Sequence, residues 1–133
     1  MTAYLIDTNH ATQIMADQTV LRTRGVSDRN TGDHFYICIT VLAELYFAAF
    51  ASQRKAQNLH HIATLLDHIP VLRFDRAAAE EYGRIKAELK AKGRPIPGTD
   101  AQIAAVARLH GLVVLTSDRH FAFVDGLQAE SWL

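Results

Sequence analysis

The strongest constraint on the fold is a series of short, continuous apolar segments that alternate with stretches of helical periodicity. Continuous apolar runs of about four residues are typical of strands buried on both faces of a parallel sheet. Their alternation with helices predicts a twisted parallel sheet of four or five strands, flanked by helices on both faces in an α/β fold. The expected strands are Ala3–Ile6, Tyr36–Ile39, Val71–Phe74, Leu112–Leu115 and a weaker Leu127–Glu130.

Residues that favour helix ends mark the intervening helices. Side chains with a short polar oxygen satisfy free backbone N–H groups at helix starts, and glycine is favoured just beyond helix ends. The expected starts are near Thr8, Thr40, Ser52, Asp75 and Thr99, and the last two helices are expected to stop before Gly93 and at Gly111. The polar stretch Arg22–Asp33 is interpreted as a loop or an irregular helix.

The composition is that of a single globular domain. The chain has 133 residues, of which 49% are apolar, and we interpret 1–133 as one domain with a full hydrophobic core. Fourteen basic and fourteen acidic residues give a formal net charge of zero, which excludes nucleic-acid binding through a globally basic surface but not through a local patch. The lone cysteine, Cys38, is interpreted as a buried small hydrophobe. With no signal peptide in view, a reducing, cytoplasmic location is expected.

One apolar stretch, 35–51, is long enough to raise the question of a membrane span. A carboxylate, Glu44, lies near its middle, and burying that charge in lipid costs about 2.5–3.5 kcal/mol or more. The first part is aromatic and β-branched, whereas the second is rich in Ala and Leu. We therefore expect a buried strand followed by a mostly buried helix, and no membrane association.

Four acidic residues occupy positions that are informative for function. Asp7 directly follows the first apolar run, and Asp118 follows the run that ends at Leu115. In parallel α/β sheets, ligands bind beyond the carboxyl ends of the strands. Glu44 lies within an apolar helical segment, and Asp100 stands at the start of a helix after a proline-containing loop.

Each acid also has an ordinary structural interpretation. Asp7 and Asp118 could cap the segments that follow them, and Asp100 could complement a helix dipole. Taken together, however, several carboxylates converging on one strand-end cleft would repel one another unless a divalent cation neutralised them. Oxygen-only ligands favour Mg²⁺ or Mn²⁺ over zinc, and such ions promote phosphodiester hydrolysis.

Four segments in this order resemble the PIN domain family, most closely the VapC-type toxins of toxin–antitoxin pairs. They are Leu-Ile-Asp-Thr-Asn at 5–9, Thr-Val-Leu-Ala-Glu-Leu at 40–45, Ile-Pro-Gly-Thr-Asp at 96–100 and Leu-Thr-Ser-Asp-Arg-His-Phe at 115–121. The resemblance implies a Mg²⁺- or Mn²⁺-dependent endoribonuclease that hydrolyses RNA. Its catalytic and metal-binding acids would be Asp7, Glu44, Asp100 and Asp118, of which the last position is variable in the family. It also implies a homodimer that is neutralised by an antitoxin protein.

Other residues are candidates for supporting roles. Asn9, Thr116 and Ser117 lie beside the acids and are expected to orient carboxylates or a bound water, with ordinary turn chemistry as the alternative. A basic stretch leads towards Asp100 and is a candidate RNA-binding surface, although a solvated helix face would look the same. The candidate RNA contacts are Arg84, Lys86, Lys90, Lys92, Arg94 and Arg119, and His120 is a candidate substrate or dimer contact.

Alternative functions remain open at this level. The same site would serve a nuclease of RNA processing or DNA repair, and a catalytically silent binding partner is a further alternative. The retention of all four acids argues against the silent partner. A receiver-like signalling domain is excluded by the residues, because receivers need paired acids after the first strand and a lysine after the last main strand. Here Asp7 stands alone and Ser117, Asp118 and Arg119 replace the lysine.

Overall fold

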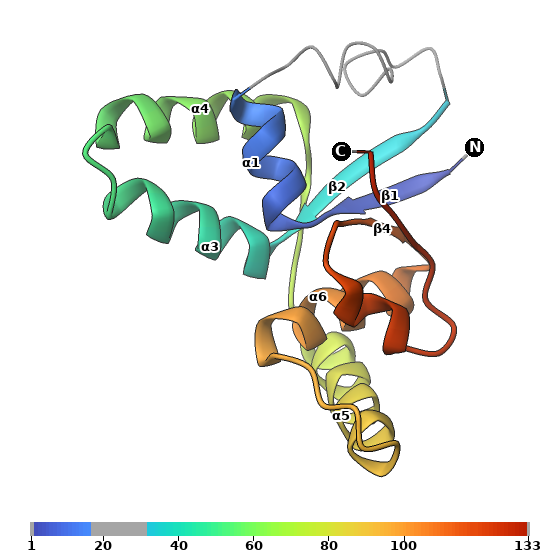
Figure 1. Ribbon diagram of the computed structural model, residues 1–133. Coiled ribbons are helices and arrows are strands. Elements are labelled where there is room, and N and C mark those ends of the chain that lie inside the picture. The colour runs from blue at the N-terminus through green and yellow to red at the C-terminus, as the bar shows by residue number, and fades with distance from the viewer. Residues whose placement is uncertain (1, 17–31, 133) are drawn as a thin grey trace.

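The fold is built on a five-stranded sheet in which every strand is parallel to its neighbours (Figure 1). The computed structural model describes residues 2–16 and 32–132, so most of the predicted Arg22–Asp33 loop lies outside the described residues. The strands are β1 (Ala3–Ile6), β2 (His34–Cys38), β3 (Val71–Leu72), β4 (Val113–Leu115) and β5 (Ala129–Glu130), in the spatial order β3-β2-β1-β4-β5. The predicted fold class is confirmed.

Helices connect the strands and form two groups (Figure 1). One group contains α1 (Thr8–Ala16), α3 (Ile39–Phe50) and α4 (Lys55–His68), which contact one another. The other contains α5 (Arg76–Ala91) and α6 (Gly98–His110), the most extensively packed pair of elements, together with the short 3₁₀ helix η2 (Arg119–Phe123) against α6. Figure 1 shows the first group on one side of the strands and the second on the other.

The strand order reverses direction at β1 and β4, so their carboxyl ends are where this topology is expected to bind a ligand. From β1 the chain passes outward to β2 and β3 on one side, and then returns to β4 on the opposite side of β1. The connections that leave these two neighbouring strands therefore diverge, which is the arrangement that opens a binding crevice in an α/β sheet. The backbone N–H of Asp7 donates to the carbonyl of Leu115 at 2.9 Å, so the two strand ends are aligned at that point.

The core consists of the strands and the helix faces turned towards them. Leu5, Ile6, Ile37 and Val114 are fully buried, as continuous apolar strands covered on both faces require. In α6, the run from Ile103 to Ala107 is buried without interruption. This helix is therefore held firmly, and it carries Asp100 in its first turn.

Some of the predicted helix ends are confirmed by the structure and others are wrong. Asp75 caps α5 by accepting a hydrogen bond from the Ala78 N–H at 3.0 Å, and Gly111 ends α6 with a left-handed φ of 66°, both as predicted. The prediction for Thr40 is wrong, because α3 already begins at Ile39 and the Thr40 hydroxyl donates instead to Gln102 Oε1 at 2.8 Å. A buried hydroxyl needs a partner, and here α6 supplies it.

The helix predicted from Ser52 begins three residues later, at Lys55. The Ser52 hydroxyl accepts from the Arg54 N–H at 3.0 Å, which forms a local turn before the helix instead of a cap on it. The helix predicted from Thr99 begins one residue earlier, at Gly98.

The expectation that α3 is mostly buried is wrong. Its buried face holds Thr40, Val41, Leu45 and Ala49, whereas Ile39, Phe47 and Phe50 are 44%, 76% and 58% exposed. The helix packs on α1 and α4 through one face, so the apolar residues of the opposite face meet solvent. Across residues 2–16 and 32–132, the structure contains no helix with the length and apolar character of a membrane span.

We expect Phe121→Ala to destabilise the protein by about 3–5 kcal/mol, because Phe121 is fully buried within η2 and its removal leaves a cavity. The matched control is Phe47→Ala, which truncates the same side chain at a 76% exposed position and should change stability by less than about 0.5 kcal/mol. Urea unfolding measures both. Equal losses in the two variants would contradict this assignment of the core.

Candidate active site

A hydrogen bond between Asp7 and Thr116 joins the ends of β1 and β4. Asp7 is only 5% exposed, and its Oδ2 accepts from the Thr116 hydroxyl at 2.7 Å while its Oδ1 accepts from the Thr8 N–H at 2.8 Å. The Thr116 oxygen in turn accepts from the backbone N–H of Asp118 at 2.9 Å. The hydroxyl of Thr116 thus contacts the side chain of Asp7 and the backbone of Asp118, and it holds both acids in place.

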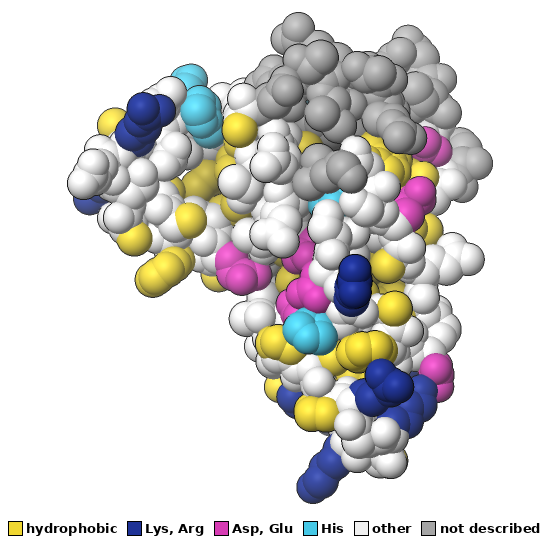
Figure 2. Space-filling model, in the orientation of Figure 1, with side chains coloured by type: hydrophobic (Ala, Val, Ile, Leu, Met, Phe, Trp, Pro, Cys, Tyr) yellow, Lys and Arg dark blue, Asp and Glu magenta, His cyan; other side chains and the backbone are white. Residues whose placement is uncertain are grey.

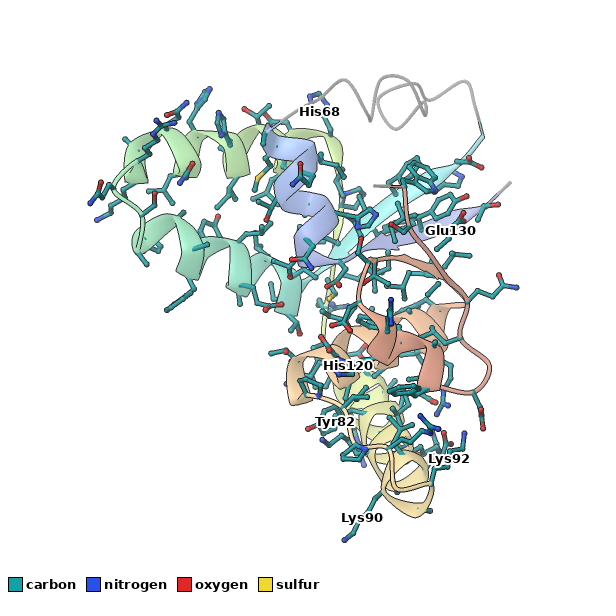
Figure 3. The ribbon with its side chains drawn as sticks, in the orientation of Figure 1. His68, Tyr82, Lys90, Lys92, His120 and Glu130 are labelled. Carbon is teal, nitrogen blue, oxygen red and sulfur yellow. The ribbon has the colours of Figure 1, made fainter. Side chains whose placement is uncertain are left out.

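Asp100, Asp118 and His120 meet beside this link. The His120 Nδ1 atom lies 3.0 Å from Asp100 Oδ2 and 2.9 Å from Asp118 Oδ1, and one candidate ligand atom from each residue lies within 4.8 Å of the other two. α6 supplies the first residue and the turn into η2 supplies the other two. Figure 2 shows acidic side chains gathered in the middle of this face with a histidine at their edge, and Figure 3 labels His120 there.

The electrostatics of the cluster reflect two carboxyl groups in close contact. Partial burial, followed by the hydrogen bond with Asp118 and the charge of that residue, raises the pKa of Asp100 to about 6. Burial acts in the same direction at Asp118, but hydrogen bonds from the backbone of His120 and from Asp100 outweigh it and lower the Asp118 pKa. Partial burial opposes protonation of His120, yet its contact with Asp100 and the charge of Asp118 raise the histidine pKa.

Glu44 is linked to Asp7 through Thr8, whereas the cluster of Asp100, Asp118 and His120 is linked to Asp7 through Thr116. The Thr8 hydroxyl donates to Glu44 Oε1 at 2.8 Å, and the glutamate is half-buried on α3. The apolar surroundings expected for Glu44 are therefore incomplete, and a threonine provides a partner for its carboxylate. The four predicted acids lie along one hydrogen-bonded chain, which runs from Glu44 through Thr8, Asp7, Thr116, Asp118 and His120 to Asp100.

The three residues predicted to support the acids differ in their placement. Thr116 is buried and contacts Asp7 directly. Ser117 is exposed and shares a hydrogen bond with the Ser131 hydroxyl at 3.2 Å. Asn9 is exposed in the first turn of α1.

The basic stretch is partly engaged in contacts within the protein. Arg84 forms ion pairs with Glu80 and Glu81, and Lys92 pairs with Asp125. Lys86 donates to the carbonyl of Ile96 at 3.1 Å, while Lys90 is exposed near the end of α5.

Two further arginines are linked to residues of the acidic cluster, one through a shared aromatic ring and one by its position in the sequence. Arg94 lies over the ring of Phe123 at 5.0 Å, and the ring of His120 packs edge-on against that same phenylalanine with the ring centroids 6.3 Å apart. Arg119 is exposed between Asp118 and His120 in the sequence.

Sequence reasoning missed two members of the site. The sequence predicts Thr8 only as the start of a helix, and it predicts His120 as a substrate or dimer contact and not as a partner of the two carboxylates. The signal for His120 was present in its spacing, because a residue two positions after Asp118 in a helical turn can direct a ring nitrogen back towards that carboxylate. The position of Asp100 opposite it depends on the packing of α6, which no local pattern reveals.

The donor set suits a divalent cation. Two carboxylates and one imidazole offer one ligand atom each, and these three atoms lie within 4.8 Å of one another. Burial, followed by the hydrogen bond and the charge of Asp118, raises the pKa of Asp100, so the metal-free cluster disfavours a negative charge on this residue. A bound cation would remove that penalty, which is the usual role of a metal among clustered carboxylates.

Comparisons with known proteins identify close relatives. Residues 4–127 match the PIN domain family. The chain is 35% identical to a tRNA(fMet)-specific endonuclease VapC of Shigella flexneri over 99% of both chains. It is 33% identical to ribonuclease VapC2 of Haemophilus influenzae over the full length of both chains.

Solved structures of VapBC proteins contain chains with a similar fold. DNA-bound VapBC from Salmonella typhimurium contains a chain with a TM-score of 0.89 and 32% identity, and the alignment covers 100% of each chain. VapBC2 from Rickettsia felis, bound to a promoter DNA fragment, gives the same TM-score at 23% identity over 99% of this chain and 100% of the other, which is evidence for the fold alone.

We expect Thr116→Val to destabilise the protein by about 1–3 kcal/mol, because it leaves Asp7 Oδ2 and the Asp118 N–H without their partner in a buried place. Thr116→Ser keeps the hydroxyl and should retain most of the stability. Thermal unfolding of the two variants measures the difference. A valine variant as stable as the serine variant would show that this hydroxyl does not hold the strand ends together.

We expect Asp100→Asn to stabilise the metal-free protein at pH 8. The Asp100 pKa of about 6 in the folded protein exceeds the usual aspartate value of 3.8, so the folded state binds the proton more tightly than the unfolded state. The contribution of Asp100 to stability therefore falls as the pH rises from about 4 to 6, and it is unfavourable above that window. Removing the charge should gain about 1 kcal/mol at pH 8, after allowance for solvent screening, and less at pH 5.

Urea unfolding in EDTA at the two pH values measures this effect. Asp67→Asn, at an exposed position on α4, is the matched control and should show no such pH dependence. Destabilisation by Asp100→Asn at pH 8 would instead assign Asp100 a structural role.

Proposed function

The chain belongs to the PIN domain family, and from this membership we infer that the protein is an endoribonuclease of the VapC toxin type. The observation that carries the inference is the hydrogen-bonded chain of four acids at the carboxyl ends of β1 and β4. That location is where an α/β sheet binds its ligands. We propose that residues 1–133 form one ribonuclease domain.

We propose that hydrolysis depends on Mg²⁺ or Mn²⁺. Asp100 and Asp118 would hold the ion, with Asp7 and Glu44 completing the acidic site. When bound, such an ion supplies activation of a water molecule and stabilisation of the negative charge that develops on a phosphodiester. This chemistry requires no covalent nucleophile from the protein.

The residues of the chain keep the acids in place for this reaction. Asp7 is almost fully buried and is held by two donors, the Thr8 N–H and the Thr116 hydroxyl, so its carboxylate has one orientation. Glu44 accepts a hydrogen bond from the hydroxyl of Thr8 and is half-exposed, so part of its side chain can contact a water molecule or substrate. Such fixed positions lower the cost of reorganisation during the reaction.

RNA is the proposed substrate, and its backbone is expected to contact the basic residues nearest the cluster. Arg94 and Arg119 are the best placed, because Arg94 shares the Phe123 ring with His120 and Arg119 is exposed next to Asp118. Arg84, Lys86 and Lys90 on α5, and Lys92 at its C-terminal cap, stay candidates as well. Since a VapC relative is specific for tRNA(fMet), initiator tRNA is the first substrate to test.

An antitoxin is the proposed protein partner. The similar solved chains come from VapBC and FitAB toxin–antitoxin structures, which supports a partner of this kind. A homodimer is proposed in addition. The exposed apolar residues Ile39, Phe47 and Phe50 of α3 support association with another protein surface, because large apolar side chains on a surface favour an interface.

We expect purified protein to cut total RNA into discrete fragments in Mn²⁺ or Mg²⁺ but not in EDTA. Asp7→Asn should lower the cleavage rate about a hundredfold or more, because it removes a charge from the centre of the acidic chain. Asp67→Asn, an exposed position on α4, is the matched control and should cut normally. Gel analysis and sequencing of the fragment ends measure the rate and identify the target.

Cleavage that persists in EDTA would overturn the metal dependence. Cleavage that Asp7→Asn leaves unchanged would overturn the site. Protein that is folded and free of antitoxin but cuts no RNA under either metal would favour a binding role or a different nucleic-acid substrate.

A further inference from the structure

We propose that His120 binds the metal ion directly through Nδ1, and that this nitrogen ligand gives the site a preference for Mn²⁺ over Mg²⁺. The inference rests on the proposed metal-dependent function and deepens it. His120 is a ligand that the pattern of acids alone does not predict. Its nitrogen would distinguish Mn²⁺ from Mg²⁺, two ions that a site of four carboxylates would bind in a similar way.

The distances within the cluster match those between neighbouring ligands of one ion. Two adjacent ligands of an octahedral ion, each about 2.1 Å from the metal, lie about 3.0 Å apart. His120 Nδ1 lies 3.0 Å from Asp100 Oδ2 and 2.9 Å from Asp118 Oδ1. These separations, which are hydrogen-bond distances in the metal-free protein, would let all three atoms bind one ion.

The local structure holds the ring in this orientation. The backbone N–H of His120 donates to Asp118 Oδ1 at 2.9 Å, which places the histidine in the first turn of η2. The ring then packs edge-on against Phe123, and the adjacent Phe121 is fully buried and anchors η2 in the core. The backbone and the packing, and not only the carboxylates, thus direct Nδ1 towards the cluster.

His120 has no evident role in the core of the fold. Its side chain is 42% exposed, and it lies at the edge of the acidic cluster (Figure 3). Removing it should therefore leave the protein folded. This exposure makes the residue suitable for mutagenesis, unlike Asp7, whose loss would disturb the buried link between β1 and β4.

The chemistry of the donor set leads to the metal preference. Mg²⁺ is a hard ion that takes oxygen ligands almost exclusively and retains several waters. First-row transition ions accept an imidazole nitrogen in addition to carboxylates. A site with two carboxylates and one imidazole should consequently bind Mn²⁺ more tightly than Mg²⁺, and loss of the imidazole should reduce that difference.

The test uses Mn²⁺ alone, with the full-length protein free of antitoxin and RNA. Pulsed electron paramagnetic resonance of bound Mn²⁺ detects the coupling of a directly ligated ¹⁴N nucleus. We expect this coupling in the unmodified protein, its loss in His120→Ala, and its retention in His68→Ala. His68 is the matched control, because it is an exposed histidine at the end of α4, away from His120 (Figure 3).

Binding measurements give a second readout. His120→Ala should weaken Mn²⁺ binding about tenfold or more and weaken Mg²⁺ binding less, which lowers the ratio between the two affinities. His120→Gln retains a hydrogen-bond donor near both carboxylates but not the ring nitrogen, and it should behave like the alanine variant. Circular dichroism in EDTA should show all three variants folded.

Several results would overturn the inference. Mn²⁺ bound to the unmodified protein without nitrogen coupling would show that His120 only donates hydrogen bonds or contacts RNA. Unchanged Mn²⁺ affinity in His120→Ala, or its full recovery in His120→Gln, would have the same meaning. If any of these results occurs while RNA cleavage still depends on a metal ion, His120 is not a ligand, but the proposed function stands. An unmodified protein that binds no Mn²⁺ and cuts RNA in EDTA would overturn both.

Discussion

The hydrogen bond from Thr116 to Asp7 is the interaction on which the site depends. It crosses between the carboxyl ends of β1 and β4, the two neighbouring strands whose connections leave in opposite directions. Because Asp7 is nearly fully buried, its carboxylate needs partners, and the Thr8 N–H and the Thr116 hydroxyl provide them. The same threonine oxygen receives the Asp118 N–H, so the position of the second acid follows from that of the first.

Beyond this link, the site is organised by the placement of like charges close together. Asp100 arrives on α6, a helix fixed by continuous burial from Ile103 to Ala107. Burial, followed by the hydrogen bond with Asp118 and the charge of that residue, raises the Asp100 pKa. His120 lies between the two carboxylates and offers a positive charge or a ligand nitrogen. In the proposed function, a metal ion bound here would compete with protons for the same ligand atoms.

The sequence predicted the sheet, the helix order and the positions of all four acids, because apolar runs and strand-end residues are local signals. The end of α6 at Gly111 and the cap at Asp75 were predictable for the same reason. The errors arose where a side chain found a distant partner. Thr40 looks like a helix cap in the sequence, but its hydroxyl reaches Gln102, which is 62 residues away. The exposure of Phe47 was equally hidden, because hydropathy does not reveal which face of α3 the other helices cover.

The sequence by itself determined that this chain forms a parallel α/β sheet with acids after its first and fourth strands. These properties depend on residue type and spacing along a few neighbouring positions. Only the tertiary structure decided that Thr8 links Glu44 to Asp7, and that His120 and Asp100 face one another. Such contacts depend on how α3, α6 and η2 pack against the sheet, and packing is set by the complementarity of whole surfaces that are far apart in the sequence.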